Sequence, residues 1–92
     1  MKDETKNILI TGGAGFIGGA LIRKLLLNSK CNVFNLDKLT NRSDLRAINC
    51  ILENQNNLKN RYTFIKSDLL NIESLNEGIN KSNPDLVFHF AA

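Results

Sequence analysis

The sequence predicts an α/β fold, a doubly wound parallel sheet, from three observations. Short apolar runs alternate with segments of helical period along the whole chain. A cluster of glycines stands where the first apolar run gives way to the first helical segment, and an aspartate ends the second run. Alternating strands and helices build a parallel sheet with right-handed crossovers, so these 92 residues can form one small domain.

Four runs rich in apolar, β-branched or aromatic residues are the expected strands, at residues 7–11, 32–37, 62–66 and 85–90. The chain closes on the fourth run, with no helix after it to cover it and no further strand to pair with its outer edge. A bare edge strand is a template for aggregation. The sequence is therefore expected to be the front part of a larger protein.

Three segments of helical period are the expected helices, at residues 16–28, 44–57 and 72–81. Their apolar residues recur three or four positions apart: Ile17, Leu21 and Leu25; Leu45, Ile48 and Leu52; Ile72, Leu75 and Ile79. Ser43 and Asn71 can cap the second and third helices. The tail of the second helix, residues 53–57, holds mostly poor helix formers and is expected to fray. Pro84 marks the loop before the last strand.

The composition favours a soluble globular protein, with 42% hydrophobic and 23% charged residues. No apolar run approaches the ~20 residues that a membrane span needs, so no membrane partner is expected. The start of the chain lacks a secretory h-region and no disulfide framework is visible, so a cytoplasmic location is expected. The net charge of +3 comes from scattered basic residues, which favours a solvated surface over nucleic-acid binding.

The stretch TGGAGFIGG, residues 11–19, lies at the first strand-to-helix turn. Gly13, Gly15 and Gly18 fit the pattern G-x-G-x-x-G, and Gly12, Gly15 and Gly18 fit its shifted form. Glycines permit the tight turn, let a pyrophosphate approach the backbone, and allow the helix to pack closely on the strand. The amides and dipole of the helix start favour an anion there. A purely structural turn is the alternative for the glycines taken alone.

Asp37 ends the second strand, 19 residues after Gly18, where a carboxylate can accept hydrogen bonds from both hydroxyls of an adenosine ribose. An exposed turn acid is the alternative interpretation. A carboxylate at this place repels a 2′-phosphate, so the cofactor is predicted to be NAD. Arg42 leaves NADP open.

Ligands of open α/β sheets lie at the carboxyl ends of the strands, so the third and fourth strands are expected to carry cofactor contacts too. After the third strand, Asp68 can accept from the adenine amino group and Leu69 can pack on the ring. Asp68 can equally start the next turn. After the fourth strand, Ala91 and Ala92 are small enough to leave room for a dinucleotide, or serve packing alone.

These motifs together resemble the extended short-chain dehydrogenase/reductase superfamily, in its NAD-dependent epimerase/dehydratase group. The likeness rests on TGGAGFIGG, on LDKLT at 36–40, on RYTFIKSDL at 61–69 and on PDLVFHFAA at 84–92, in that order and spacing. Within the group it is greatest to the nucleotide-sugar 4,6-dehydratases, whose second strand typically ends in Asp-Lys-Leu-Thr, where epimerases usually show Asp-Asn. One departure is Asn41-Arg42-Ser43, where those dehydratases commonly have Tyr-Ala-Gly.

The resemblance implies a Rossmann-like domain of which this chain is the first β-α-β-α-β-α-β portion, without a substrate domain. It implies roles for four groups of residues: Gly12, Gly15, Phe16, Ile17 and Gly18 at the pyrophosphate; Asp37, Lys38 and Thr40 at the adenosine ribose; Asp68 and Leu69 at the adenine; and Ala91 and Ala92 bordering the ribose and pyrophosphate. The full-length enzyme is expected to be a lyase that oxidises sugar C4, eliminates water across C5 and C6 and returns the hydride to C6. A homodimer is expected for the full-length protein. The alternatives are an epimerase, reductase or decarboxylase of the same family, or a non-catalytic dinucleotide-binding module.

No catalytic residue is expected within this chain. Tyr62-Thr63-Phe64-Ile65-Lys66 matches the family's Tyr-x-x-x-Lys pair, but it forms a predicted strand, where the two side chains are not one helical turn apart. His89, the only histidine, is expected to be a structural residue of the last strand. Cys31 and Cys50 show no metal-ligand spacing and are expected to be small buried residues.

Overall fold

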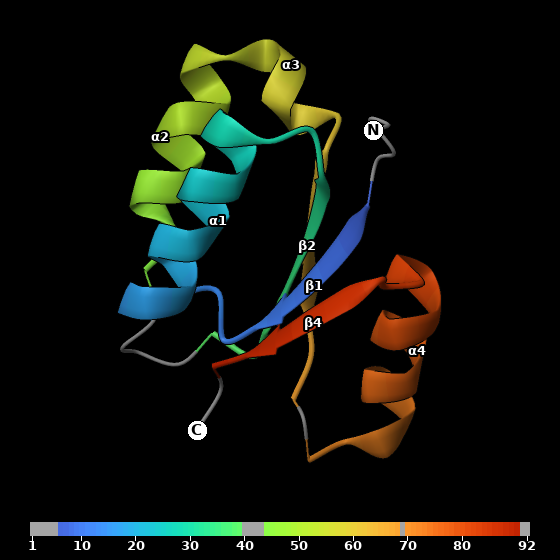
Figure 1. Cartoon of the computed structure of the whole chain (residues 1–92). Helices are drawn as coiled ribbons and strands as arrows, with labels where there is room; N and C mark the ends of the chain where they lie inside the picture. The colour runs from blue at the N-terminus through green and yellow to red at the C-terminus, as the bar shows by residue number, and fades with distance from the viewer. Residues whose placement is uncertain (1–5, 40–43, 69, 91–92) are drawn as a thin grey trace.

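The computed structural model describes residues 6–39, 44–68 and 70–90, and these form one parallel four-stranded sheet with helices on both faces (Figure 1). The strands are β1 (Asn7–Thr11), β2 (Asn32–Asp37), β3 (Tyr62–Lys66) and β4 (Leu86–His89). Their order across the sheet is β3-β2-β1-β4, and every pair is parallel. The predicted fold class, an α/β doubly wound sheet, is confirmed.

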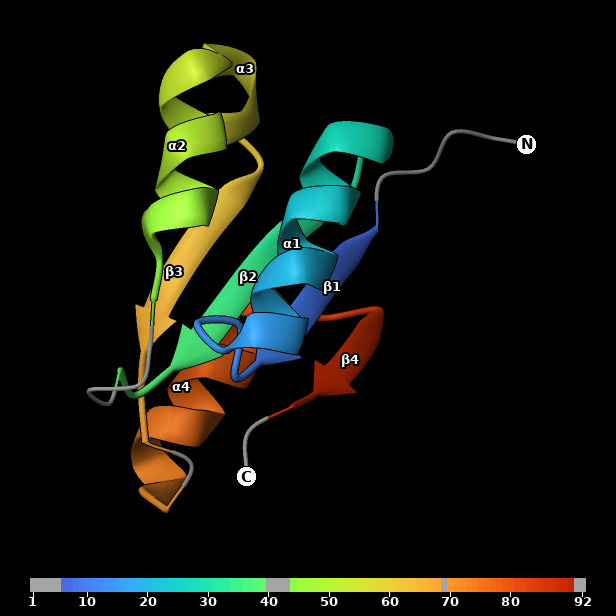
Figure 2. The same ribbon diagram turned by 90° about the vertical axis from the view of Figure 1, so that its left-hand side faces the viewer.

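Four helices connect the strands. They are α1 (Phe16–Asn28), α2 (Arg46–Asn54), α3 (Asn56–Lys59) and α4 (Ile72–Ser82). Figures 1 and 2 show α1, α2 and α3 together on one face of the sheet and α4 on the opposite face. The chain moves outward from β1 to β3 and then crosses to place β4 on the other side of β1. The strand order thus reverses between β1 and β4, and this reversal is the place where open α/β sheets bind ligands.

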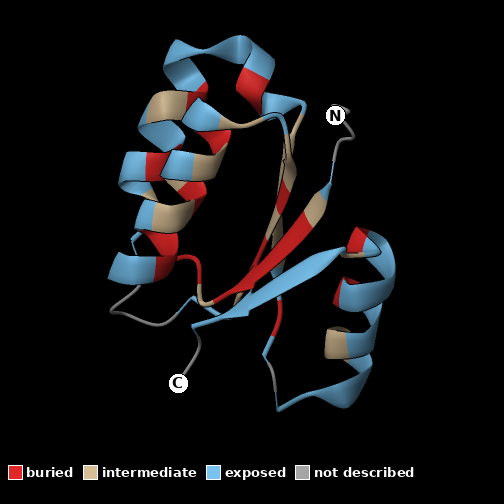
Figure 3. Cartoon of the chain, in the orientation of Figure 1, coloured by how far each residue is buried: buried red, intermediate tan, exposed pale blue. Residues whose placement is uncertain are grey.

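The main core lies between the sheet and the layer of α1, α2 and α3 (Figure 3). Its buried members are Ile8, Ile10, Ile22, Leu26, Val33, Ile48, Leu52 and Leu58. Burying a side chain of this size contributes about 1.5–3 kcal/mol, so this cluster holds α1 and α2 firmly against the strands. The face of α1 that it uses is formed by Ile22 and Leu26, with Leu21 and Leu25 at its margin, while Ile17 is 65% exposed.

The other face of the sheet is covered more thinly. Gly78 of α4 packs against Leu36, whose Cδ1 lies 2.6 Å from the place where a Cβ on Gly78 would stand. Leu86 and Val87 of β4 are 48% and 55% exposed although successive residues point to opposite faces of the sheet. Figure 3 accordingly shows β4 exposed along its length while the neighbouring β1 is buried. Both faces of β4 are therefore open in this chain.

The strand register aligns the carboxyl ends of β2, β1 and β4. Thr11, the last residue of β1, lies opposite Leu36 of β2 and His89 of β4. The residues that follow these positions emerge at one edge of the sheet. That edge is where the glycine turn begins and where Asp37 stands.

Two local predictions are wrong. The segment 44–57 is not one helix, because the backbone at Gln55 leaves the helical region (φ −136°, ψ 92°) and a separate short helix, α3, follows. Asn56 and Asn57, which were expected to fray, therefore belong to a second helix. Cys50 is exposed and Cys31 is half-buried, so neither is the fully buried small residue that was expected. The remaining strand and helix limits agree with the prediction to within one residue at each end.

Within the described residues no helix has the length and apolar character needed to cross a bilayer. The same part of the chain holds no group of histidine, cysteine and acidic side chains that could bind a metal ion.

Candidate functional site

The glycine turn leaves β1 through a backbone conformation that only glycine adopts readily. Gly12 has φ 80°, and its N–H donates to the carbonyl of Leu36 at 2.9 Å, so the turn is tied to β2. Its carbonyl in turn accepts from the N–H of Gly15 at 3.1 Å. These two bonds fold residues 12–15 into a compact loop, hereafter the glycine loop, between β1 and α1.

Two further glycines of this region are required because neighbouring atoms occupy the space of a side chain. A Cβ on Gly18 would lie 2.5 Å from the Gly12 carbonyl oxygen and 3.0 Å from the Gly13 Cα. A Cβ on Gly13 would collide with the side chains of Asn35 and Ile22. Gly18 thus lets α1 approach the glycine loop itself, rather than the strand as the sequence predicted.

Gly15 differs from both, because it faces open space. The nearest atom to its potential Cβ is the Gly12 carbonyl oxygen at 3.4 Å, an ordinary contact, and its φ of −83° suits any residue. Neither the fold nor the backbone explains a glycine here. The space beside the backbone of Gly15 is open, and this is where the sequence predicts that a pyrophosphate approaches.

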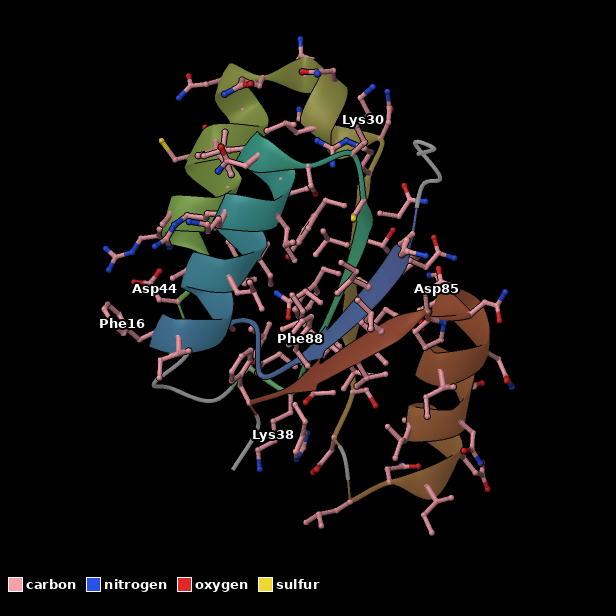
Figure 4. All side chains as sticks on the ribbon, viewed as in Figure 1. Phe16, Lys30, Lys38, Asp44, Asp85 and Phe88 are labelled. Atoms are coloured by element: carbon pink, nitrogen blue, oxygen red, sulfur yellow. The ribbon has the colours of Figure 1, made fainter. Side chains whose placement is uncertain are left out.

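The start of α1 offers main-chain donors to that space. Gly15 is the N-cap, and because it has no side chain it cannot cap the helix amides. The first turn contains no acidic residue. The N–H groups of the first turn of a helix have no partner within the helix, so those of Phe16, Ile17 and Gly18 are available to an anion. Figure 4 shows Phe16 pointing away from the protein at this helix end, and its side chain is 90% exposed. Phe16 and Ile17 therefore contribute main-chain groups here, not core packing.

Asp37 stands beside the glycine loop at the end of β2. Its Oδ2 accepts a hydrogen bond from the N–H of Ala14 at 3.0 Å, and its Oδ1 accepts from the N–H of Leu39 at 2.8 Å. Leu39 adopts φ 59°, a left-handed conformation that is uncommon for leucine. The carboxylate is thus fixed by main-chain donors and points to the loop, not outward into solvent.

The β4 side of the same edge is tied to β1 by one side-chain contact. Thr11 and the Nδ1 of His89 form a hydrogen bond between the last residues of the two strands. The rings of Phe88 and Phe90 stack at 6.5 Å between centroids, with planes 6° apart. His89 therefore has a structural partner, in agreement with its expected role.

Asp44, two residues before the start of α2, is tied to the glycine loop. The N–H of Asp44 donates to the carbonyl of Ala14 at 2.8 Å, which anchors this segment to the glycine loop. The side chain of Asp44 pairs with Arg46 at 2.8 Å, and hydrogen bonds from Arg46 lower the pKa of Asp44 from 3.8 to about 2. Because its charge is balanced by Arg46, Asp44 adds little net repulsion against an anion at the loop.

The other predicted site residues divide into two groups. Lys38 and Asp68 are exposed, and the Oδ1 of Asp68 accepts from the N–H of Leu70 at 3.0 Å, so Asp68 does shape the next turn. Four residues lie outside the described part of the chain: Thr40, Leu69, Ala91 and Ala92. Ser43, the predicted N-cap of the second helix, also lies outside the described part. So does Arg42, the residue that kept NADP as an alternative cofactor.

The Tyr62 and Lys66 pair lies on β3, as expected, and not on a helix. In a strand, four residues span about 13 Å, so the ammonium cannot influence the phenol as it would one helical turn away. The Tyr62 hydroxyl instead accepts from the Nδ2 of Asn35 at 3.1 Å. Burial raises the pKa of Tyr62 above its usual value, against the effect of the Asn35 hydrogen bond, and Asp37 raises it further.

Two residues of the site were not predicted. Ala14 donates the main-chain N–H that orients Asp37, and nothing in an alanine reveals such a role. Asn35 lies fully buried under Gly13, and here a signal existed: it is flanked on the same strand face by Val33 and Asp37. A polar residue on the same strand face as Asp37, the residue expected to bind the ribose, is placed to point toward the glycine loop.

The fold and the glycine loop define a doubly wound α/β protein with an anion-accepting turn and a fixed carboxylate at the switch point of its sheet. Residues 9–92 match the family described as GDP-mannose 4,6 dehydratase, and the chain belongs to this family. A curated relative, the dTDP-glucose 4,6-dehydratase of Neisseria gonorrhoeae, is 41% identical over 87 residues, which are 95% of this chain and 24% of the relative. The chain thus spans about a quarter of the length of such relatives.

Solved structures agree with this assignment. The dTDP-glucose 4,6-dehydratase of Bacillus anthracis in complex with NAD is 31% identical, with a TM-score of 0.80 over 96% of this chain and 27% of that one. The UDP-Glc/GlcNAc 4-epimerase of Campylobacter jejuni is 28% identical, with a TM-score of 0.78 over 97% of this chain and 25% of that one. A dehydratase and an epimerase therefore share the fold of this chain.

Proposed function

We propose that this chain is the NAD-binding portion of a nucleotide-sugar 4,6-dehydratase that acts on dTDP-glucose. The observation that carries the proposal is the convergence of the Asp37 carboxylate and the glycine loop, joined through the N–H of Ala14 at 3.0 Å. A fixed carboxylate beside a set of unpaired helix amides suits a molecule with a sugar diol next to a diphosphate. The Bacillus anthracis relative, which is a complex with NAD, supports the choice of cofactor.

The residues present fit this cofactor. The open space at Gly15 admits a diphosphate to the amides of Phe16, Ile17 and Gly18, where it accepts hydrogen bonds and benefits from the α1 dipole. Each oxygen of Asp37 uses one lone pair on a main-chain donor and keeps another for a ribose hydroxyl. A 2′-phosphate would face this carboxylate, which favours NAD over NADP.

When bound, NAD supplies the acceptor and donor of the hydride that moves from sugar C4 to C6. The residues of this chain hold the cofactor and orient it; no residue among those described is placed to transfer the protons of the dehydration. Those groups, the substrate contacts and the dimer expected for this family belong to our proposal for the whole protein. Lys38, Thr40, Asp68, Leu69, Ala91 and Ala92 complete the proposed cofactor site.

A second candidate is a 4-epimerase of the same family, because the Campylobacter jejuni epimerase shares the fold with a TM-score of 0.78. The sequence Asp37-Lys38-Leu39-Thr40 favours the dehydratase. Incubating the polypeptide, as its gene encodes it, with dTDP-glucose and NAD separates the two by mass spectrometry. A dehydratase product has lost one water, whereas an epimerase product keeps the mass of the substrate. Absence of a reaction with any nucleotide sugar would instead indicate a non-catalytic dinucleotide-binding module.

A further inference from the structure

A buried carboxamide lies directly beneath the glycine loop. Asn35, in the middle of β2, is 0% exposed and occupies the place where a Cβ of Gly13 would stand. Its Nδ2 donates to the Tyr62 hydroxyl at 3.1 Å. Its Oδ1, which is the atom nearest to where a Gly13 Cβ would stand, has no hydrogen-bond partner among the described residues. The loop therefore rests on an amide whose nitrogen is held and whose oxygen is not.

This arrangement is unfavourable for folding alone. A buried oxygen without a partner destabilises the folded state, and an apolar side chain of similar shape would remove that cost. The neighbours on β2, Val33 and Leu36, are apolar and fully buried, so the strand tolerates such side chains. Packing does not explain why an asparagine stands at this position.

The position of Asn35 relative to Asp37 suggests the reason. The two residues are two positions apart on β2 and so share one face of the strand. Asn35 contacts Gly13, and Asp37 accepts a hydrogen bond from Ala14, the next residue of the loop. Two polar side chains of one strand thus set the height and the orientation of successive loop residues.

We propose that Asn35 is a positioning residue for the dinucleotide, and that Tyr62 fixes the plane of its carboxamide. Asn35 acts through Gly13: it sets the distance between the glycine loop and the sheet, and thereby the spacing between the α1 amides and the Asp37 carboxylate. This inference rests on the proposed NAD binding. Asn35 itself is enclosed by protein and touches no ligand.

The shape of a carboxamide suits this role. It is flat and places a single oxygen in the space beside Gly13 that a side chain would otherwise fill. A leucine in its place would present branched methyl groups and push the loop outward. The torsion that turns a carboxamide is soft, so the hydrogen bond to Tyr62 is needed to hold its plane.

The test compares two properties of the Asn35→Leu variant, in the polypeptide as its gene encodes it. NAD affinity is measured by calorimetry, and the free energy of unfolding is measured in denaturant without NAD. We expect the Kd for NAD to rise about tenfold or more, because the anchoring groups are displaced. Removing the unpartnered oxygen favours the folded state, whereas losing the hydrogen bond to Tyr62 and displacing the loop oppose it, so we expect only a small net change in stability.

A matched control removes a buried polar group elsewhere. The hydroxyl of Ser82 on α4 is also 0% exposed and donates to the Ile79 carbonyl at 3.2 Å. Ser82→Ala is expected to lower stability and to leave the Kd for NAD unchanged. A role of Asn35 in the fold alone would make Asn35→Leu behave as Ser82→Ala does, and that result overturns the inference.

The Tyr62→Phe variant tests whether Tyr62 holds the plane of the Asn35 carboxamide. It removes the hydrogen bond between the two side chains, and we expect it to raise the Kd for NAD less than Asn35→Leu does. Because Tyr62 acts through Asn35, the double variant should match Asn35→Leu alone rather than show the sum of both effects. Additive effects, or an unchanged Kd in Tyr62→Phe, would remove Tyr62 from the proposal.

Failure of this inference is distinguishable from failure of the proposed function. If the unsubstituted protein binds NAD and Asp37→Asn weakens it, but Asn35→Leu binds as tightly as the parent, only the positioning role of Asn35 is wrong. If the unsubstituted protein does not bind NAD, the proposed function and this inference are both wrong.

Discussion

The Oδ2 atom of Asp37 accepts a 3.0 Å hydrogen bond from the main-chain N–H of Ala14, and this bond joins the end of β2 to the loop that follows β1. It places a carboxylate and a helix start side by side before any ligand arrives. Binding energy is then not spent on bringing them together, which is how preorganisation raises affinity.

Asp37→Asn keeps the size of the side chain but removes its charge and one of its two acceptor oxygens. We expect NAD affinity to fall about 10- to 100-fold, the range for losing hydrogen bonds to a charged group. The preference for NAD over NADP should also shrink, because the repulsion of a 2′-phosphate is lost. Calorimetric titration with each dinucleotide measures both, and Glu77→Gln on α4 is the control for a change in net charge. Equal affinities in Asp37→Asn and the parent would contradict a ribose-binding role.

Gly15 and Gly18 provide a matched pair of substitutions to alanine. Gly18→Ala places a Cβ 2.5 Å from the Gly12 carbonyl oxygen, so the backbone must shift, and we expect the free energy of unfolding to fall by about 1–3 kcal/mol. Gly15→Ala meets nothing closer than 3.4 Å and should change stability by less than about 0.5 kcal/mol. Both should weaken NAD binding, but only Gly15→Ala should do so without a loss of stability in chemical denaturation. If Gly15→Ala binds NAD normally, the open space above it is not the diphosphate site.

Arg61 joins the end of α1 to the start of β2. Its guanidinium donates at 2.7 Å to the carbonyl of Leu26 and at 2.7 Å to the carbonyl of Cys31. The carbonyls of the last helical turn lack partners within the helix, so this contact satisfies one of them. We expect Arg61→Ala to lower the free energy of unfolding by about 2 kcal/mol, and Arg61→Lys by less, since an ammonium cannot reproduce the forked geometry. Denaturant titration of the three proteins gives the order, and an equal loss in both variants would show that the fork is unimportant.

The pH dependence of stability reports on Tyr62. Burial raises the pKa of Tyr62 in the folded protein above the 10.0 of a free phenol. The unfolded chain therefore loses this proton first, so the stabilisation is complete below pH 10 and is lost as pH rises through the folded pKa. Lysines titrate in the same range, so the informative quantity is the difference between the parent and Tyr62→Phe. That difference should be constant up to about pH 9 and then change in favour of Tyr62→Phe; a constant difference up to pH 11 would contradict it.

The strands were predictable because the residues that define each one, an apolar run and its polar or glycine borders, are adjacent in the sequence. β1, β2 and β3 begin and end where the sequence predicts, since the apolar runs are bounded by polar or glycine residues. α1 also has the predicted limits, but the apolar period alone did not show which residues it buries. Ile17 lies at i−4 from Leu21 and yet is 65% exposed, because the start of α1 projects away from the core.

The parts that were missed depend on tertiary contacts. The break at Gln55 allows Leu58 to reach the core cluster from a separate helix, and no local propensity reveals that need. Asn35 lay in an apolar run and received no role, because its importance comes from Gly13, distant in sequence and adjacent in space. Glycines and a strand-end aspartate are visible in sequence, whereas the residues that hold them in place are not, or give only the weak signal of a polar side chain on the same strand face.

The uneven covering of the sheet has a consequence for how the molecule opens. The cluster of buried side chains lies on the side of α1, α2 and α3, whereas α4 is held through fewer buried residues, Gly78 and Ser82. Local fluctuations that release a helix should therefore begin with α4 and leave the opposite layer intact. Amide hydrogens of α4 would exchange with solvent, and its peptide bonds would become accessible to proteases, while the turn at Gly12 keeps its shape.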